Sequence, residues 1–352
     1  MMEIYFNMYK IKYSILNDLL NMENNLDYRK PINLFINLNP VLKHMTDDKC
    51  IDYLKMNNPI KHIEFISNVI NLAAHYKGFF IKNGINLNIY LYIQHPFEST
   101  DQINRKYNDE YRMYSEYKFT NETVVPLTNI VNNTIPNIEN IVSYIPNVYF
   151  IKSNNIESSL IPMIIDNENS IIITDDLYEF QYVNYGYHIL LPKRSKSILL
   201  NNDNIINYIS STNEIKTKNI SSTFLPFILS IYGNKYRNIY KIKGFGLKTI
   251  FKSLEKAITE GLITYKTSNI ELLLGVIKQS LRKEVRNNFY CTDINYQYNN
   301  LTSIDIDNVK SQIIDKYNPS ALNIVNNKYF ELYPLQLIEL TSEVVETKKI
   351  KF

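Results

Sequence analysis

The chain has 352 residues, of which 45% are hydrophobic, so it can bury a full core as one large domain or two coupled lobes. Its formal net charge of +3 is too small to indicate a nucleic-acid partner unless the cations cluster. The two distant cysteines, Cys50 and Cys291, support neither a disulfide framework nor a zinc site. The sequence shows no membrane-length apolar run and no signal-peptide core, so we expect an intracellular protein without a membrane partner.

Asparagine, isoleucine, lysine and tyrosine are frequent, whereas glycine is scarce, with 8 residues, and tryptophan is absent. The favoured residues have AT-rich codons, so genome composition accounts for the 29 tyrosines without any role in base stacking. The same bias suggests a viral, phage or organelle-like source. For a viral or phage source we expect a location in the host cytoplasm or in the virion.

Residues 1–30 predict an amphipathic N-terminal helical lead-in, and residues 31–215 alternate short apolar runs with amphipathic stretches. Buried strands are expected at 33–38, 87–93, 170–174 and 188–191. A helix is expected at 63–76. Strands alternating with helices predict an α/β domain whose mainly parallel sheet is flanked by helices. Ligands of such sheets bind beyond the carboxyl ends of the strands. The positions of interest are therefore Asn37, Gln94, 174–176 and 192–196.

The remaining regions are more polar or mostly helical. A polar, Asn-rich connection between Tyr92 and Pro146 includes a basic stretch at 105–118. Residues 216–268 predict a helical lobe with a tight glycine-containing turn. Residues 269–352 predict a C-terminal helical extension with two or three helices, a turn at 333–334 and a charged tail. We find no internal repeat.

The most informative stretch runs from Phe224 to Phe251 and holds three of the eight glycines. Within it, Gly244-Phe-Gly246 precedes a predicted helix whose first turn carries Lys248 and Thr249. Glycines at such a corner let the backbone approach an anion closely, so that amide N–H groups at the helix N-terminus face it. Lys248 adds a positive charge for the same phosphate. The pattern therefore predicts an anion contact at this corner.

The charge distribution points the same way, because no Asp or Glu occurs from Ile215 to Leu254. The cations over that span are Lys216, Lys218, Lys235, Arg237, Lys241, Lys243, Lys248 and Lys252. Together with the glycine corner, this asymmetry predicts a contact with the DNA backbone. An ordinary turn between helices with a solvated basic face is the alternative.

The segment Gly233-Asn-Lys-Tyr-Arg-Asn-Ile, followed by Gly244-Phe-Gly-Leu-Lys-Thr, resembles the helix-three-turn-helix of the 5′-nuclease family, which includes flap endonucleases and 5′-3′ exonucleases. Three upstream segments fall in the family's order. They are 34–39, which resembles the first strand, 155–160, which resembles the Glu-Ala-Asp-Asp element, and 172–181, which resembles Val-Ser-x-Asp-x-Asp-Phe-x-Gln. The basic stretch 105–118 lies where the family has its arch. The resemblance implies a PIN-like α/β fold with a helix-hairpin-helix lobe.

The same resemblance implies a site for divalent cations, but most of its carboxylates are replaced here. The positions of the family's aspartates hold Asn37, Ser159, Leu160, Tyr178, Asn234 and Arg237. Glu157 and Asp176 are retained as candidate metal ligands, and they could hold one Mg²⁺ weakly through water. Two metal ions need a denser set of anionic oxygens. Two alternatives stay open: Asp47, Asp48 or Asp166 completes a site, or Asp175 and Asp176 cap the next helix.

The leading hypothesis is a catalytically impaired or inactive 5′-nuclease-like protein that serves as a non-catalytic subunit of a viral or phage nucleic-acid-processing assembly. We expect no cofactor, or weakly bound Mg²⁺, and no residue is assigned a catalytic role. The expected partner is double-stranded or branched DNA, bound through Gly244, Gly246, Lys248, Thr249, Lys241 and Lys243. A protein partner is expected at the C-terminal region. The alternatives are a divergent Mg-dependent 5′-3′ exonuclease or flap endonuclease, and a purely structural protein.

Overall fold

The computed structural model describes residues 16, 17, 20, 26–38, 59–94, 135–143, 145–153, 156–165, 169–192, 198–215, 220–233, 239 and 241–313. Most of the lead-in, the basic stretch 105–118 and all residues after 313 lie outside this set. The turn at 333–334, the charged tail and most of the expected C-terminal protein-binding region are therefore not described.

A six-stranded sheet with the order β3-β2-β1-β4-β5-β6 forms the centre of the fold. Its strands are β1 (Ile32–Asn37), β2 (Leu87–Gln94), β3 (Val148–Ser153), β4 (Ser170–Ile173), β5 (His188–Leu191) and β6 (Ile198–Leu200). The first five are parallel along the sheet, and only β6 runs antiparallel, against β5. The predicted mainly parallel sheet is confirmed. As a result, the carboxyl ends of β1 to β5 meet at one edge.

The sequence did not predict β3 or β6. The β3 segment follows the polar, Asn-rich connection that was expected to run to Pro146, and it forms the outer strand of the sheet beside β2. The β6 segment has three residues, too few for a periodic pattern to emerge. Both strands lie at the two ends of the strand order, so only the inner strands carried a clear sequence signal.

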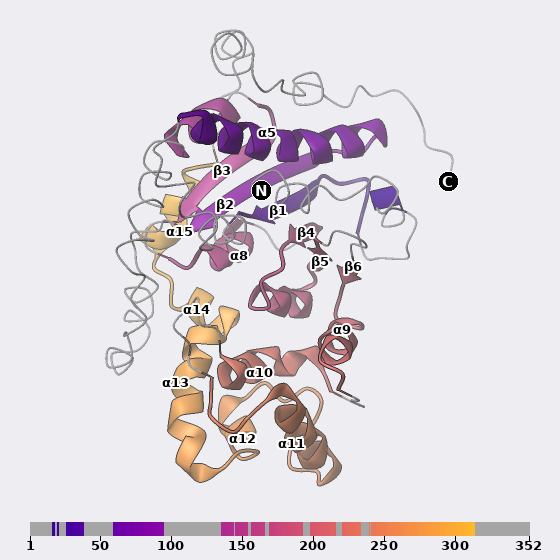
Figure 1. Cartoon of the computed structure of the whole chain (residues 1–352), viewed down its shortest axis with the longest axis vertical. Helices are drawn as coiled ribbons and strands as arrows, with labels where there is room; N and C mark the ends of the chain where they lie inside the picture. The colour runs from indigo at the N-terminus through magenta and orange to yellow at the C-terminus, as the bar shows by residue number, and fades with distance from the viewer. Residues whose placement is uncertain are drawn as a thin grey trace.

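Successive strand residues face opposite layers, because side chains in a strand alternate. Ile32, Leu34 and Ile36 join one core, with α5 (Pro59–Lys82) and a helix over 135–142. Figure 1 shows α5 lying along this face of the sheet, and it includes the predicted helix 63–76. Phe35 faces the other layer, where its ring stacks on Tyr90 with a centroid separation of 4.8 Å. Helices thus cover both faces.

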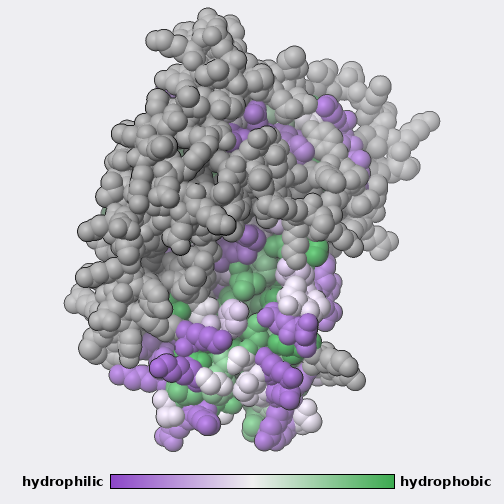
Figure 2. Space-filling model, in the orientation of Figure 1, coloured by the Kyte–Doolittle hydropathy of each residue, from purple (hydrophilic) through white to green (hydrophobic). Residues whose placement is uncertain are grey.

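The elements on the second face continue into a helical lobe beyond the sheet (Figure 1). They are η2 (Ser158–Leu160), α8 (Ile161–Ile165), η3 (Glu179–Tyr185), α9 (Ile205–Thr212), η4 (Ser222–Phe224), α10 (Leu225–Tyr232), α11 (Leu247–Thr259), α12 (Ile270–Leu274), η6 (Gln279–Leu281), α13 (Arg282–Thr292), α14 (Ile294–Asn299) and α15 (Ser303–Lys310). In Figure 2, hydrophilic residues line the outer rim of this lobe around more apolar surface.

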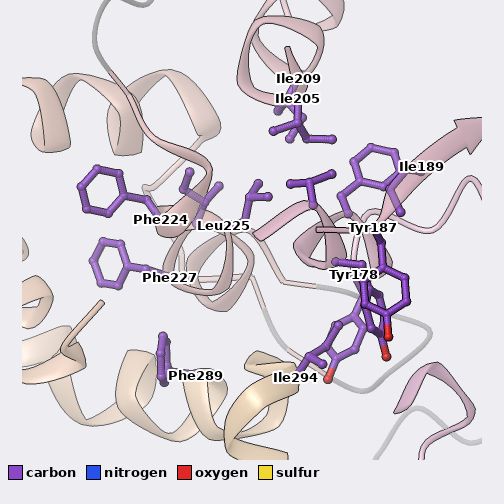
Figure 3. Close-up of a cluster of buried hydrophobic side chains, with 14 of the residues drawn as sticks. Tyr178, Tyr187, Ile189, Ile205, Ile209, Phe224, Leu225, Phe227, Phe289 and Ile294 are labelled. Carbon is purple, nitrogen blue, oxygen red and sulfur yellow. The ribbon is translucent and has the colours of Figure 1, made fainter. Parts of the chain in front are cut away.

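One hydrophobic core joins the lobe to the sheet. Figure 3 shows Phe227 and Phe289 of the lobe in the same cluster as Tyr178, Tyr187 and Ile189 beside the sheet. A buried polar link reinforces it, because the Gln181 carboxamide donates to the carbonyl oxygens of Tyr178 and Thr292 at 3.0 and 2.8 Å. The lobe is therefore held firmly against the strand ends.

The C-terminal extension contains more helices than we expected. Four helices, α12 to α15, lie between residues 270 and 310, where two or three were predicted for the whole extension. The difference comes from side-chain caps that start new helices. Asp293 accepts hydrogen bonds from the amides of Asn295 and Tyr296, and Thr302 forms a capping box with Asp305. No helix among the described residues is long and apolar enough to cross a membrane.

Candidate functional site

The first candidate site is the edge where the parallel strands end. β1 ends at Asn37, which is paired with Tyr92 of β2, and Ile36 is paired with Ile173, so Thr174 follows at the same edge. Asn37, Tyr92 and Thr174 each have 0% of their surface exposed. Strand alternation points all three side chains toward the layer that contains Phe35. Ligands of this class of sheet bind at such an edge.

A carboxyl group from η3 fills the space between these strand ends. Glu179 is fully buried, and the Tyr92 hydroxyl donates to its Oε1 at 2.7 Å. The side chains of Thr174 and Asn37 also lie close enough to favour its charged form. Its second oxygen, Oε2, accepts no hydrogen bond of standard geometry from the described residues. We call Asn37, Tyr92, Thr174 and Glu179 the strand-end cluster.

The electrostatics of this cluster favour a proton on Glu179. Burial and, to a smaller extent, the negative charge of Asp176 raise the pKa of Glu179 to about 7, although the nearby polar side chains of Thr174 and Asn37 and the hydrogen bond from Tyr92 oppose the rise. Burial and the neighbouring Glu179 also raise the pKa of Tyr92 well above its ordinary value, so its hydroxyl stays a neutral donor. Near neutral pH the cluster therefore has little negative charge to offer a cation.

The two retained candidate ligands are engaged in different places. The Asp176 carboxylate accepts a hydrogen bond from the Tyr178 amide at 3.0 Å and so caps the turn that leads into η3. The N-cap of η3 itself is Tyr178, whose side chain forms no cap hydrogen bond, so Asp176 caps the preceding turn and not the helix as expected. Glu157 precedes η2 and is nearly buried. Burial raises the pKa of Cys291 on α13 to about 12, and the negative charge of Glu157 is the second cause of this rise. Glu157 therefore lies near that helix.

Of the other positions where the family pattern has aspartates, some are buried in the fold and the rest lie outside the described residues. Ser159 and Leu160 are fully buried in η2, and the Ser159 carbonyl accepts a hydrogen bond from Tyr182. Tyr178 is also buried, in the second core. Residues lying outside the described set are Asn234, Arg237, Asp47, Asp48 and Asp166.

The described side chains at the strand ends do not fit a pair of divalent cations. Such a pair needs several anionic oxygen ligands, whereas this edge offers an amide, a phenol, a hydroxyl, the buried carboxyl group of Glu179 and, near it, the Asp176 carboxylate, which the Tyr178 amide already engages. Among the described residues, no group of three His, Cys, Asp or Glu side chains could hold a metal ion. No metal-dependent step is derived from this edge, and the roles predicted for Glu157 and Asp176 stay predictions.

The second candidate site is the hairpin between α10 and α11. α10 ends at Gly233, which has a φ of +75°, and the chain returns so closely that the Ile242 amide donates to the Ile231 carbonyl at 3.0 Å. A Cβ at Gly233 would lie 2.5 Å from the Lys241 nitrogen. Only glycine fits this crossing, so the first glycine of the motif fixes the shape of the hairpin.

The tip of the hairpin is open to solvent. Gly244 is exposed and has a φ of +82°, which favours glycine, and Gly246 is the N-cap of the 13-residue helix α11 with an ordinary φ of −93°. A Cβ at either glycine would have no neighbour within 4 Å. Of these two glycines, only Gly244 therefore uses the positive φ that glycine permits. At Gly246 the absence of a side chain leaves the space in front of the helix free.

Backbone and side-chain donors converge on this tip. The amides of Thr249 and Ile250 both bond to the Gly246 carbonyl, at 2.9 and 3.1 Å, whereas no hydrogen bond among the described residues uses the amides of Leu247 or Lys248. The exposed side chains around the tip are those of Lys241, Lys243, Lys248 and Thr249. The Lys241 Nζ lies 5.5 Å from the centre of the Tyr232 ring, a cation–π contact that orients it. The predicted DNA-contact residues thus lie together on one hairpin.

Sequence reasoning found half of the strand-end cluster. Asn37 and Thr174 were among the positions of interest, whereas Tyr92 was placed in the expected strand 87–93 without a role in the site, and Glu179 was given no role. The pairing of Tyr92 with Asn37 depends on the register between two strands 55 residues apart in sequence. Strand alternation was the available signal, because Tyr90 and Tyr92 share a face.

No family model and no curated protein matches the sequence. Among solved structures, the chain is similar to the bacteriophage T5 D15 protein co-crystallised with metal ions, with a TM-score of 0.52 and 12% identity over 81% of this chain and 99% of that one. A zinc-bound T5 5′-exonuclease has a TM-score of 0.47 and 10% identity, over 80% and 98% of the two chains. At such identities the likeness concerns the fold alone. The protein has the PIN-like fold of the 5′-nucleases, as the motifs predicted.

Proposed function

We propose that this protein binds the phosphate backbone of duplex DNA through the hairpin between α10 and α11 and does not cleave it. In this role it is a non-catalytic, 5′-nuclease-like subunit of a viral or phage nucleic-acid-processing assembly. The observation that carries the proposal is the hairpin tip, where the open N-terminus of α11 meets the exposed Lys241, Lys243 and Lys248.

The chemistry of the tip suits a phosphate group. The amides of Leu247 and Lys248 lie at the positive end of a helix, where an anion is stabilised. Gly246 leaves room for a phosphate to reach them. Within the described residues, neither Lys243 nor Lys248 forms an ion pair, so a bound phosphate would not have to displace an acidic partner. Contacts of this kind do not read base identity.

The strand-end cluster supports the non-catalytic half of the proposal. In this fold class the strand ends are where a ligand would bind, and here Tyr92 and Glu179 occupy that space with a hydrogen bond of 2.7 Å. Stabilising the attacking and leaving oxygens of a phosphodiester takes two divalent cations about 4 Å apart. Glu179, whose pKa is raised to about 7, and the neighbouring Asp176, which caps a turn, are a poor basis for such a pair.

Salt-dependent binding to one duplex tests the proposed interface. The logarithm of the binding constant should fall with the logarithm of the salt concentration, by about 0.9 per phosphate contact. Lys248→Ala should reduce this slope by about one unit and weaken binding to every duplex sequence alike. Gly246→Val should weaken binding but leave the salt slope nearly unchanged. The valine side chain blocks the close approach of the phosphate to the helix N-terminus, whereas the number of positive charges stays the same. Fluorescence anisotropy titrations at several salt concentrations measure both effects.

Two observations make these variants interpretable. Gly246 has an ordinary φ and open surroundings, so Gly246→Val is expected to fold, which circular dichroism checks. Lys278→Ala removes an exposed lysine outside the hairpin and should leave the slope nearly unchanged. If the wild type fails to bind duplex even at low salt, the hairpin is only a turn between two helices. The hypothesis of a purely structural protein would then lead.

A further inference from the structure

The lysines of α11 form a row that extends beyond the hairpin tip. Lys248, Lys252 and Lys256 are exposed and follow one another at intervals of four residues. Four residues of α-helix rise about 6 Å and turn about 40° past a full circle, so the row spans about 12 Å along one face of the helix. The opposite face of α11 is buried in the second core through Leu247, Ile250, Phe251, Leu254 and Ala257.

This arrangement is unfavourable for the helix itself. Like charges four residues apart repel one another and destabilise a helix. Lys248 also stands in the first turn, where the helix dipole disfavours a cation, and no acidic residue occupies that turn. Core packing does not account for such a row, because the three side chains are exposed, whereas a bound polyanion would remove both penalties.

The charges of the row are also largely uncompensated. Among the described residues, no ion pair involves Lys248 or Lys252. Lys256 meets Glu260 at 3.6 Å, but the side chains are 75% and 49% exposed, and such surface pairs are weak. The uncompensated charge is therefore greatest next to the hairpin tip and decreases toward the end of the helix.

We infer that the bound duplex runs along α11, so that one strand continues from the hairpin tip onto Lys252 and Lys256. This inference rests on the proposed function and adds the direction of the DNA and two further contact residues. The length of the row corresponds to about three to four steps of 3.4 Å along one strand. A polyanion with regularly spaced charges is the partner that such a row fits.

Single-lysine variants of the row test the direction. Lys252→Ala and Lys256→Ala should each reduce the salt slope of duplex binding, by about one unit for Lys252 and by less for Lys256, whose charge is shared with Glu260. The matched control is Lys266→Ala, an exposed lysine after the end of α11, which should leave the slope unchanged. Lys252→Ala loses a like-charge neighbour and gains a better helix former, so its melting temperature should equal or exceed that of the wild type. Lys256→Ala also loses the weak pair with Glu260, so its melting temperature should stay close to that of the wild type.

A charge added in line with the row gives an independent readout. Thr259 is exposed at the last position of α11 and lies eleven residues, about three full turns, after Lys248. Thr259→Lys should increase the slope and tighten binding. The direction along α11 is wrong if Lys248→Ala reduces the salt slope by about one unit but Lys252→Ala and Lys256→Ala keep the slope of the wild type and of Lys278→Ala. In that case the hairpin contact itself is still supported. If the wild type does not bind duplex DNA at all, both the proposed function and the direction along α11 are contradicted.

Discussion

Gly233→Ala is expected to destabilise the protein by about 3 kcal/mol or more, because it combines a steric clash of about 1–3 kcal/mol with a backbone conformation, φ +75° and ψ 167°, that is essentially restricted to glycine and costs another residue about 1–3 kcal/mol. The added Cβ would lie 2.5 Å from the Lys241 nitrogen and 2.8 Å from the Ile239 oxygen. Both are backbone atoms, so no side-chain rotation relieves the contact. Urea unfolding followed by circular dichroism measures the loss.

Gly244→Ala is the matched comparison for this prediction. Gly244 has a similar φ, +82°, but a Cβ there would meet nothing within 4 Å. It should therefore cost only the backbone term of about 1 kcal/mol. If Gly233→Ala proves no more destabilising than Gly244→Ala, the chain crossing at Gly233 is not as tight as the structure has it.

The folding stability of the wild type should decrease between about pH 4.5 and pH 7 because of Glu179. Its pKa is raised from 4.5 in the unfolded chain to about 7 in the fold, so the folded state holds the proton more tightly. At low pH both states are protonated. As pH rises through this window the unfolded state ionises first, and stability falls by about 1.4 kcal/mol per pH unit, or about 3 kcal/mol in total. Above pH 7 the loss is complete.

Glu179→Gln isolates this effect from the other titrating groups. The amide keeps an oxygen for the Tyr92 hydroxyl but cannot ionise, so the variant should be more stable than the wild type above pH 7. The difference between their unfolding free energies, measured from pH 4 to 8, should grow through the window. Asp176→Asn should make the rise smaller and end it at a lower pH, because it removes the neighbouring charge that helps to raise the pKa of Glu179 in the folded state. A constant difference across the whole range would contradict the assignment.

The inner part of the sheet could be predicted because each strand carried its own signal. The apolar runs that became β1, β2, β4 and β5 are bounded by polar residues, and α5 has helical periodicity. The hairpin was recognisable for the same local reason, since its glycines and lysines lie within one short stretch of sequence. Features fixed within about twenty residues were therefore within reach of sequence reasoning.

The strand-end cluster could not be predicted in the same way. Tyr92 and Thr174 come to one place only because β1 pairs with β2 on one side and β4 on the other, in a register that no short segment specifies. The turn capped by Asp176 then brings Glu179 back over the strand ends. Similarly, the sequence does not distinguish Gly244 from Gly246. Their backbone angles do: Gly244 has a positive φ that favours glycine, whereas Gly246 has an ordinary φ and leaves open space in front of the helix.

The most direct test of the central claim, binding without cleavage, measures both properties on one sample. A labelled 5′-flap duplex is titrated with the wild type at low salt in Mg²⁺ or Mn²⁺, and the DNA from each point is then resolved on a denaturing gel. We expect saturable binding and full-length DNA throughout. Cleavage products that disappear in Asp176→Ala would contradict the claim and identify a divergent metal-dependent nuclease.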